Sequence, residues 1–444
     1  MRVVVVGAGL AGLSAASRLV ATGADVTVLE ARSRVGGRTF GIEVAPGVWV
    51  DAGAAYLGER HTALVTLLDE LGCKTVPTSV DGHSRFALGT GVQTRAGRFP
   101  PLSAVALGTL FDLLDDVTGK VRPDAPWLSP GAERLDELTV AEWLEDRLPP
   151  DARLFLPLFL GEMMAADPAD VSVLHMAFYL RSGGGLRYLN AFAGGAQDSR
   201  VAGGAHEVCE RLAEELAGRV HLREPVHAID QDAAGATVHS RGGSVRADAV
   251  VVAVPPLLAD AIDFRPGRPV GRAGSRTAPG CAVKVHLIYP RPIWREQELS
   301  GWSMSAGGPL LSTVDDSPAD AAVGVLTGFV TGREAHRFAA LPDRQRRAEV
   351  LAQAHRLFPG LPEPVRVEVT DWINDPYSRG CYAALMGPGH WRRHGPYLTT
   401  PHGRVHWAGT ETSTEFFGLM EGAIRSGHRA AAEISAVLPT TSRK

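Results

Sequence analysis

The first 38 residues alternate between apolar runs and glycines in a pattern that predicts one compact unit. An apolar run, Val3–Val6, predicts a buried strand and leads directly into the glycine-rich hexapeptide GAGLAG at residues 7–12. A helical pattern follows, and a second apolar run, Val26–Leu29, ends at Glu30. A strand, a glycine turn, a helix and a second strand in this order are typical of the first half of a dinucleotide-binding fold.

Each part of this unit has a physical role in binding a dinucleotide. Gly7 permits the tight turn, Gly9 lets the backbone approach a pyrophosphate, and Gly12 lets the helix pack close to the strand. The helix N-terminus offers free N–H groups and the positive end of its dipole to the phosphates. Glu30 is placed to accept hydrogen bonds from a ribose, which favours an adenine dinucleotide without a 2′-phosphate. The alternative interpretation, a glycine-rich turn that binds no ligand, is disfavoured because the preceding strand, the following helix and Glu30 all match a dinucleotide-binding unit.

Patterning along the rest of the chain interrupts this domain and then resumes it. Residues 79–200 carry prolines among helical patterns and predict a mostly helical insertion, in which the acidic run Glu133–Glu145 is expected to be solvated. The α/β pattern returns at residue 201. The other expected elements are a hairpin through Pro46-Gly47, helices at 62–72, 208–216, 342–357 and 420–437, and strands at 220–222, 226–229, 237–239, 248–256, 277–331 and 405–407.

These elements predict an α/β protein with a Rossmann-like domain assembled from discontinuous segments. We assign residues 1–78, 201–270 and 396–444 to the dinucleotide-binding domain. Residues 79–200 and 271–395 are assigned to a mixed α+β substrate-binding domain with the helical insertion.

Composition narrows the class of protein. The chain of 444 residues is 45% hydrophobic and carries a net charge of −4, which argues against a nucleic-acid partner. It has no apolar run of about 18 residues, and residues 439–444 are polar, so no membrane anchor is expected. The four cysteines lie far apart and the histidines lack metal spacing, which predicts no disulfide framework, no metal site and a cytoplasmic location.

Four segments carry a resemblance to a known family. The run EARSRVGGR at residues 30–38 resembles the second motif of the FAD-dependent amine oxidase superfamily. Residues 282–296, 371–385 and 404–431 narrow the resemblance to the flavin-containing monoamine oxidases, and the likeness extends over nearly the whole chain. It implies FAD as the cofactor, a small-molecule amine as the substrate and O2 as the electron acceptor.

The resemblance also implies a set of cofactor contacts beyond the glycine turn. Cys381 matches the cysteine that forms a thioether with the flavin in monoamine oxidases, although a lone cysteine is otherwise most often a small buried apolar residue. The helix beginning at Met420 would direct its N-terminus at the negative charge of a reduced flavin. The implied contacts are Glu30, Arg32, Arg38, Ala54, Ala55, Tyr56, Val226, Trp372, Cys381, Glu411 and Met420.

Lys284 is the implied catalytic residue for the reaction with oxygen. It matches the lysine that, in this family, hydrogen-bonds a water at flavin N5. Val283 and Val285 flank it in the strand pattern, so its side chain lies on the opposite face. Only four of the 45 basic residues are lysine, which makes a merely solvated lysine here a poorer explanation. A compact ammonium near N5 would stabilise the negative charge that develops as oxygen is reduced.

The resemblance places two aromatic residues as a cage before the flavin, and this chain departs from that pattern. Tyr382 fills one position, with a catalytic and substrate-binding role, but Leu419 occupies the other. Phe417 or Trp407 would have to replace the missing ring. Gln197 matches a glutamine that lines the substrate cavity. The incomplete cage points to a larger or unusual amine.

We therefore predict an enzyme that oxidises an amine C–N bond to an imine, with O2 reduced to H2O2. Three alternatives stay open at this stage: a polyamine oxidase, a biosynthetic flavoenzyme whose imine is captured internally, and an FAD-bound scaffold without catalysis. The sequence also leaves open a homodimer.

Overall fold

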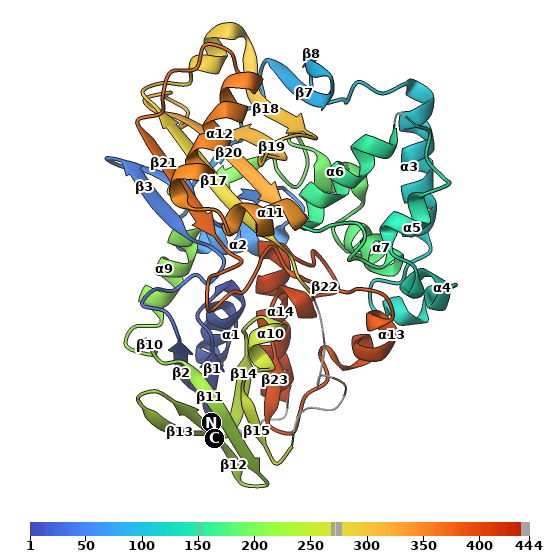
Figure 1. The fold of residues 1–444 in the computed structure, drawn as a ribbon. Helices are drawn as coiled ribbons and strands as arrows, with labels where there is room; N and C mark the ends of the chain where they lie inside the picture. Colours follow the sequence, from blue (N-terminus) through green and yellow to red (C-terminus); the bar gives the residue numbers. More distant parts are fainter. Residues whose placement is uncertain (151, 268–270, 272–277, 437–444) are drawn as a thin grey trace.

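A five-stranded parallel sheet forms the lower half of the molecule in Figure 1. The computed structural model describes residues 1–150, 152–267, 271 and 278–436. The strands lie in the order β10-β2-β1-β14-β23. Strand β1 contributes four consecutive buried valines, as expected for a strand covered on both faces. The strands are β1 (Arg2–Val6), β2 (Asp25–Glu30), β10 (Val220–Leu222), β14 (Ala249–Val252) and β23 (Val405–Trp407).

Two helices from opposite ends of the chain pack together on this sheet. Helix α1 (Leu10–Ala21) follows the glycine turn, and α14 (Met420–Ala436) closes the described part of the chain. A Cβ on Gly427 would lie 2.3 Å from the Ala11 carbonyl oxygen, so glycine is needed for this close approach. The predicted order of strand, glycine turn, helix and strand is confirmed. Residue 437 of the predicted closing helix and the polar residues 439–444 lie outside the described residues.

Smaller elements complete this half. A four-stranded sheet contains β11 (Val226–Asp232), β12 (Gly235–Ser240), β13 (Gly243–Ala247) and β15 (Asp263–Arg265), of which β13 and β15 had no predicted counterpart. The predicted hairpin is β3 (Gly41–Ala45) and β4 (Val48–Asp51). The remaining elements are β5 (Tyr56–Leu57), α2 (Thr62–Leu71), β6 (Thr75–Pro77), β9 (Ser199–Val201), α9 (His206–Glu215), α10 (Pro256–Ala259), β16 (Ala278–Pro279) and β22 (Ala384–Leu385).

A seven-stranded sheet forms the upper left of Figure 1, in the order β21-β17-β20-β19-β18-β7-β8. Helices α11 (Gly332–Ala339) and α12 (Asp343–Leu357) pack on the face that carries Val283 and Val285 of β17. Lys284 therefore points to the other face. The strands are β7 (His83–Gly89), β8 (Gly91–Ala96), β17 (Ala282–Tyr289), β18 (Leu299–Ser305), β19 (Ser312–Asp315), β20 (Gly324–Thr331) and β21 (Arg366–Asp371).

The helical region on the right of Figure 1 corrects two details of the sequence analysis. Residues 79–200 also contribute β7 and β8, and β7 pairs in parallel with β18 more than 200 residues later in the chain. Asp136, within the run expected to be solvated, is fully buried and accepts a backbone hydrogen bond from Arg392 at 3.0 Å. The helices are α3 (Ala104–Gly119), α4 (Ala132–Glu137), α5 (Val140–Leu144), α6 (Ala152–Met164), α7 (Val173–Ser182), α8 (Leu186–Asn190) and α13 (His390–His394).

The described residues contain neither a candidate membrane-spanning helix nor a candidate metal site. None of the helices there combines the length and the apolar composition that crossing a membrane requires. Nor does any group of three or more histidine, cysteine, aspartate or glutamate side chains in those residues form a candidate metal site. The division into two domains stays a prediction.

Candidate active site

One cavity of about 460 Å³ connects the glycine turn with the large sheet. Gly7, Gly9 and Glu30 line one part of it, and Lys284 and Tyr382 line another. Most of the predicted site residues share this wall. They are Gly7, Gly9, Glu30, Arg32, Arg38, Ala54, Ala55, Tyr56, Gln197, Val226, Lys284, Trp372, Cys381, Tyr382, Leu419 and Met420. We call the part lined by the glycine turn the cofactor end.

Each glycine of the turn does something different. Gly7 adopts a φ of +101°, which favours glycine. Gly12 does not line the cavity. It packs against the turn itself, since a Cβ there would lie 1.9 Å from the Gly7 carbonyl oxygen. A Cβ on Gly9 would meet no protein atom closer than 3.8 Å, so the space beside Gly9 is open. Glu30 braces the turn by accepting from the Ala8 N–H at 2.8 Å. The geometry fits a pyrophosphate that approaches the backbone at Gly9.

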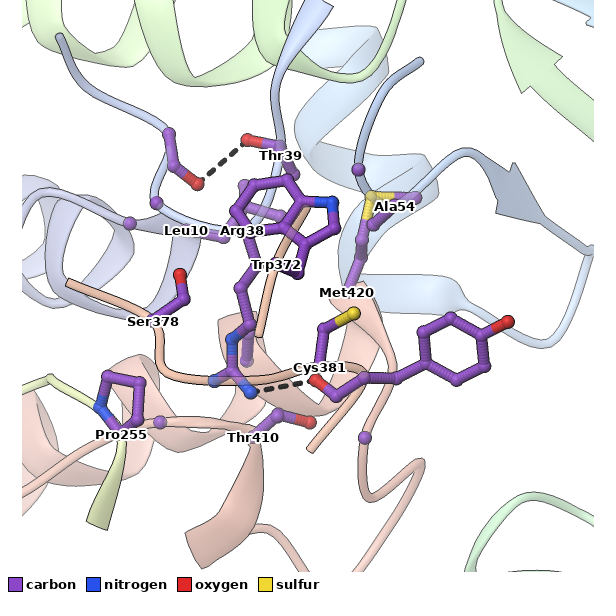
Figure 2. Close-up of a pocket in the computed structure, with 18 of the residues that line it drawn as sticks. Leu10, Arg38, Thr39, Ala54, Pro255, Trp372, Ser378, Cys381, Thr410 and Met420 are labelled. Carbon is purple, nitrogen blue, oxygen red and sulfur yellow. Dashed lines mark hydrogen bonds between the residues drawn. The ribbon is translucent and has the colours of Figure 1, made fainter. Parts of the chain in front are cut away.

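Two arginines connect the cofactor end with the segment around Cys381. Arg32 pairs with Asp375. Arg38 forms a bidentate ion pair with Glu411, at 2.6 and 3.0 Å, and donates to the Tyr382 carbonyl oxygen at 2.7 Å (Figure 2). Glu411 does not line the cavity, so it acts here through Arg38 rather than by contact with a ligand. Burial raises the pKa of Glu411, but Arg38 outweighs burial and leaves this pKa below its ordinary value.

Lys284 is a buried cation held by main-chain oxygens. Its Nζ donates to the carbonyl oxygens of Asp51 at 2.5 Å and Gly53 at 3.1 Å. It also lies 5.3 Å from the ring centre of Phe329, its neighbour across the sheet. Burial lowers the pKa of Lys284, and the charge of Asp316 is the largest effect that opposes this shift. Lys284 therefore places a concentrated positive charge at the cavity wall.

Cys381 lies at the same end of the cavity as Lys284. It packs in a small cluster with Trp372, and Figure 2 shows both side chains close to Arg38 and Met420. Burial raises the pKa of the Cys381 thiol to about 12, although Arg38 and Lys284 oppose the shift. The thiol is thus protected from solvent and faces two cations.

The aromatic cage is only partly present. Tyr382 and Leu419 both line the cavity, but Phe417 does not. Phe417 is buried against Phe178, with ring centres 5.4 Å apart, so its assignment as a substrate contact is wrong. Trp407 is also buried elsewhere, 5.8 Å from the ring of Phe264. Both rings are needed in the core, and neither completes the cage.

Comparisons with known proteins agree with this geometry. A family model for flavin containing amine oxidoreductases matches residues 10–435. The chain belongs to this family. AofH of Mycobacterium tuberculosis, named as a flavin-containing monoamine oxidase, is 37% identical over 98% of this chain and 97% of its own length. Amine oxidase [flavin-containing] A of Sus scrofa is 34% identical over 100% of this chain and 86% of its own length.

Solved structures in the family superpose closely on this amine oxidase. Cyclohexylamine oxidase from Brevibacterium oxydans gives a TM-score of 0.92 with 33% identity over 98% of both chains. Putrescine oxidase bound to putrescine gives 0.91 with 32% identity, covering 98% of this chain and 99% of that one. The predicted α/β fold, FAD as the cofactor and the oxidation of an amine are confirmed.

Sequence reasoning missed several polar or aromatic residues on the cavity wall of this oxidase, and four of them bear on substrate binding. Glu162 and Tyr179 come from α6 and α7, Arg98 follows β8, and Trp302 lies on β18. None of them belongs to a motif. One signal in the sequence could have identified Glu162, because it is the only acidic residue of a helix that is apolar apart from Glu162 and Arg153.

Proposed function

We propose that FAD lies along the cavity with its isoalloxazine ring near Lys284, Cys381 and Tyr382, and that O2 is the electron acceptor. The observation that supports this is the continuity of one cavity from the glycine turn to these three residues. FAD, when bound, supplies a two-electron oxidation that takes a hydride equivalent from the α-carbon of the amine and leaves an imine. The predicted products are the imine and H2O2.

The chain orients the amine and excludes water. Tyr382 and the apolar side chain of Leu419 line the site and favour the neutral form of the amine, which has the free electron pair that the oxidation requires. Lys284 keeps its positive charge available because both hydrogen-bond acceptors are neutral carbonyl oxygens. An ammonium held in this way stabilises negative charge that develops on oxygen.

We further propose that Cys381 carries FAD through a thioether to a methyl group of the flavin. Forming this bond would remove the thiol proton and one methyl hydrogen, and the two electrons released would pass to the flavin ring and from there to O2. The thiolate is the reactive form of cysteine, and Arg38 and Lys284 both favour it. Precipitation with acid should leave flavin on the wild-type polypeptide and release it from Cys381→Ser. Cys73→Ser removes a thiol that does not line the cavity and serves as the matched control. Free flavin in the supernatant of the wild-type protein would refute the attachment.

Release of peroxide across primary, secondary, aromatic and polyamine substrates tests the activity itself. Amine-dependent peroxide is expected, and its absence with flavin bound would favour a scaffold. Leu419, in place of an aromatic residue, supports a second candidate in which the imine is captured within the product. Mass spectrometry separates the two, because hydrolysis gives an aldehyde and capture gives a ring or conjugate.

We also propose a cytoplasmic location. All four cysteines are free thiols, which is typical of proteins in a reducing cytoplasm. The homodimer stays a prediction.

A further inference from the structure

A carboxylate lies in the part of the cavity that would receive the amine. Glu162 comes from α6 and shares the cavity wall with Tyr382, Tyr179 and Trp302. These neighbours are aromatic, so the surroundings solvate a charge poorly. We call this part of the cavity the amine end.

Among the described residues, no cation forms an ion pair with Glu162. Within the described ranges, Glu162 takes part in no ion pair with a nitrogen within 4.0 Å, although many arginines elsewhere in those ranges pair with carboxylates. Burial raises its pKa, and neither the nearby Ser312 hydroxyl nor the charge of Arg98 compensates fully. Glu162 is half-buried and faces the cavity. A carboxylate among aromatic rings is costly to keep ionised, and a ligand cation would relieve that cost.

Arg98 is the nearest candidate partner, but only its Nη2 is hydrogen-bonded, and its Nε and Nη1 are buried without a hydrogen-bond partner. Its guanidinium donates to the backbone oxygen of Asn190 at 2.6 Å and to the side-chain oxygen of the same residue at 3.1 Å. It also lies over the ring of Phe192, 4.1 Å from its centre. These contacts hold Arg98 at the side of the cavity. The charge of Arg98 partly compensates that of Glu162, but the two side chains form no ion pair, and Glu162 still faces the cavity.

Lys284 lines the same cavity but does not compensate the charge of Glu162. Its charge contributes to the raised pKa of Tyr382, after burial and Cys381. Lys284 is not among the groups that shift the pKa of Glu162. Glu162 therefore lies within electrostatic reach of the ring that would orient the amine, and the charge of Lys284 does not shift its pKa.

We propose that Glu162 is a second anchor for the substrate, and that the substrate class is an alkyl diamine whose remote ammonium pairs with this carboxylate. The inference rests on the proposed function, because it requires the reacting nitrogen to lie at Tyr382. One nitrogen must be neutral to react, while the other stays protonated to pair with Glu162. Pairing with Glu162 would favour the diamine that has one neutral and one protonated nitrogen. This role would also account for a carboxylate among aromatic side chains.

The first test compares three substrates of equal chain length: pentylamine, the corresponding terminal diamine and the corresponding amino alcohol. In Glu162→Gln, KM for the diamine should rise about tenfold or more, because one partner of a buried charge pair is lost. The value for pentylamine should change less than about twofold. Glu145→Gln, an exposed acid with no cavity contact, should match the wild type for all three.

A second test measures binding without turnover. Analogues of the diamine and monoamine with two methyl groups on each amine-bearing carbon have no α-hydrogen and cannot be oxidised. Calorimetry on the flavin-loaded protein should show the diamine analogue binding about tenfold more tightly than the monoamine analogue, and Glu162→Gln should remove that difference.

The outcomes separate the two proposals. Equal preference for diamine and amino alcohol, or an unchanged diamine preference in Glu162→Gln, would overturn the anchor while leaving amine oxidation intact. Failure of the wild type to oxidise any amine would overturn the proposed function, and the binding difference would still report on Glu162.

Discussion

The cofactor end and the amine end of the cavity are built in different ways. The cofactor end uses main-chain groups and glycines within residues 7–12, braced by Glu30. The amine end uses side chains from α6, α7 and β18, which are separated by long stretches of chain. The geometry of a site formed by main-chain groups of one turn depends on the local sequence. A site made of side chains depends on which elements the tertiary fold brings together.

The two ends also treat charge differently. At the cofactor end, Arg38 on the cavity wall forms a complete bidentate pair with Glu411. At the amine end, Glu162 has no such partner among the described residues. An ion pair between two side chains of the protein stabilises the segments that carry them. An uncompleted charge on a cavity wall is suited to binding something that the protein does not itself contain.

The largest expected effect comes from Lys284, where the two ends meet. Lys284→Met should lower the rate of oxygen consumption at saturating amine by about 10²–10³-fold, because a preorganised positive charge is removed. The exposed Lys74→Met is the control and should behave as wild type. A rate within a few-fold of wild type would show that this ammonium is structural. Circular dichroism should confirm that both variants fold.

The pH dependence of stability should have opposite signs for His61, which is buried outside the cavity, and for Glu162 at the amine end. Burial lowers the pKa of His61, beside α2, to about 4 from 6.5. The unfolded chain therefore binds this proton first, and about 3 kcal/mol of stability is lost as the pH falls from the upper value to the lower one. Chemical denaturation across this range should show the loss. His61→Gln should reduce it, whereas the exposed His227→Gln should not.

Glu162 should act in the other direction. Its folded-state pKa is raised, so the folded chain holds the proton more tightly and stability falls as the pH rises above the ordinary glutamate range. Glu162→Gln should flatten this part of the profile. An unchanged slope in the variant would mean that Glu162 is not buried in a costly ionised state.

Gly12 and Gly9 distinguish packing from ligand binding within one turn. Gly12→Ala should destabilise the protein by about 2–3 kcal/mol, because its Cβ would overlap the Gly7 backbone. Gly9→Ala should leave the free energy of unfolding of the flavin-free protein within about 0.5 kcal/mol and reduce flavin content. The two measurements are denaturant unfolding and flavin absorbance per polypeptide. Equal flavin content in wild type and Gly9→Ala would contradict the close approach at Gly9.

The smallest effects should come from Phe417 and Leu419. Phe417→Leu should cost about 1 kcal/mol in stability and leave KM unchanged, since Phe417 packs in the core. Leu419→Phe should change KM for bulky amines with little effect on stability, since Leu419 lines the cavity. Steady-state kinetics and thermal unfolding check both. The reverse pattern would restore Phe417 as a substrate contact.

Local patterns in the chain were sufficient for the parallel sheet, the glycine turn and the face of β17 that carries Lys284. These features follow from φ limits, helix dipoles and the two-residue period of a strand, which act over a few residues. The motifs also identified Cys381 and Arg38, and the structure brings both to one cavity wall.

The pairing of β7 with β18, the burial of Phe417 and the position of Glu162 came only from the folded chain. Apolar periodicity reports that a residue is covered, but not whether a core or a cavity covers it, and so Phe417 and Leu419 could not be told apart. Glu162 becomes informative only when strands and helices from distant segments surround it with aromatic rings and leave its charge without a partner.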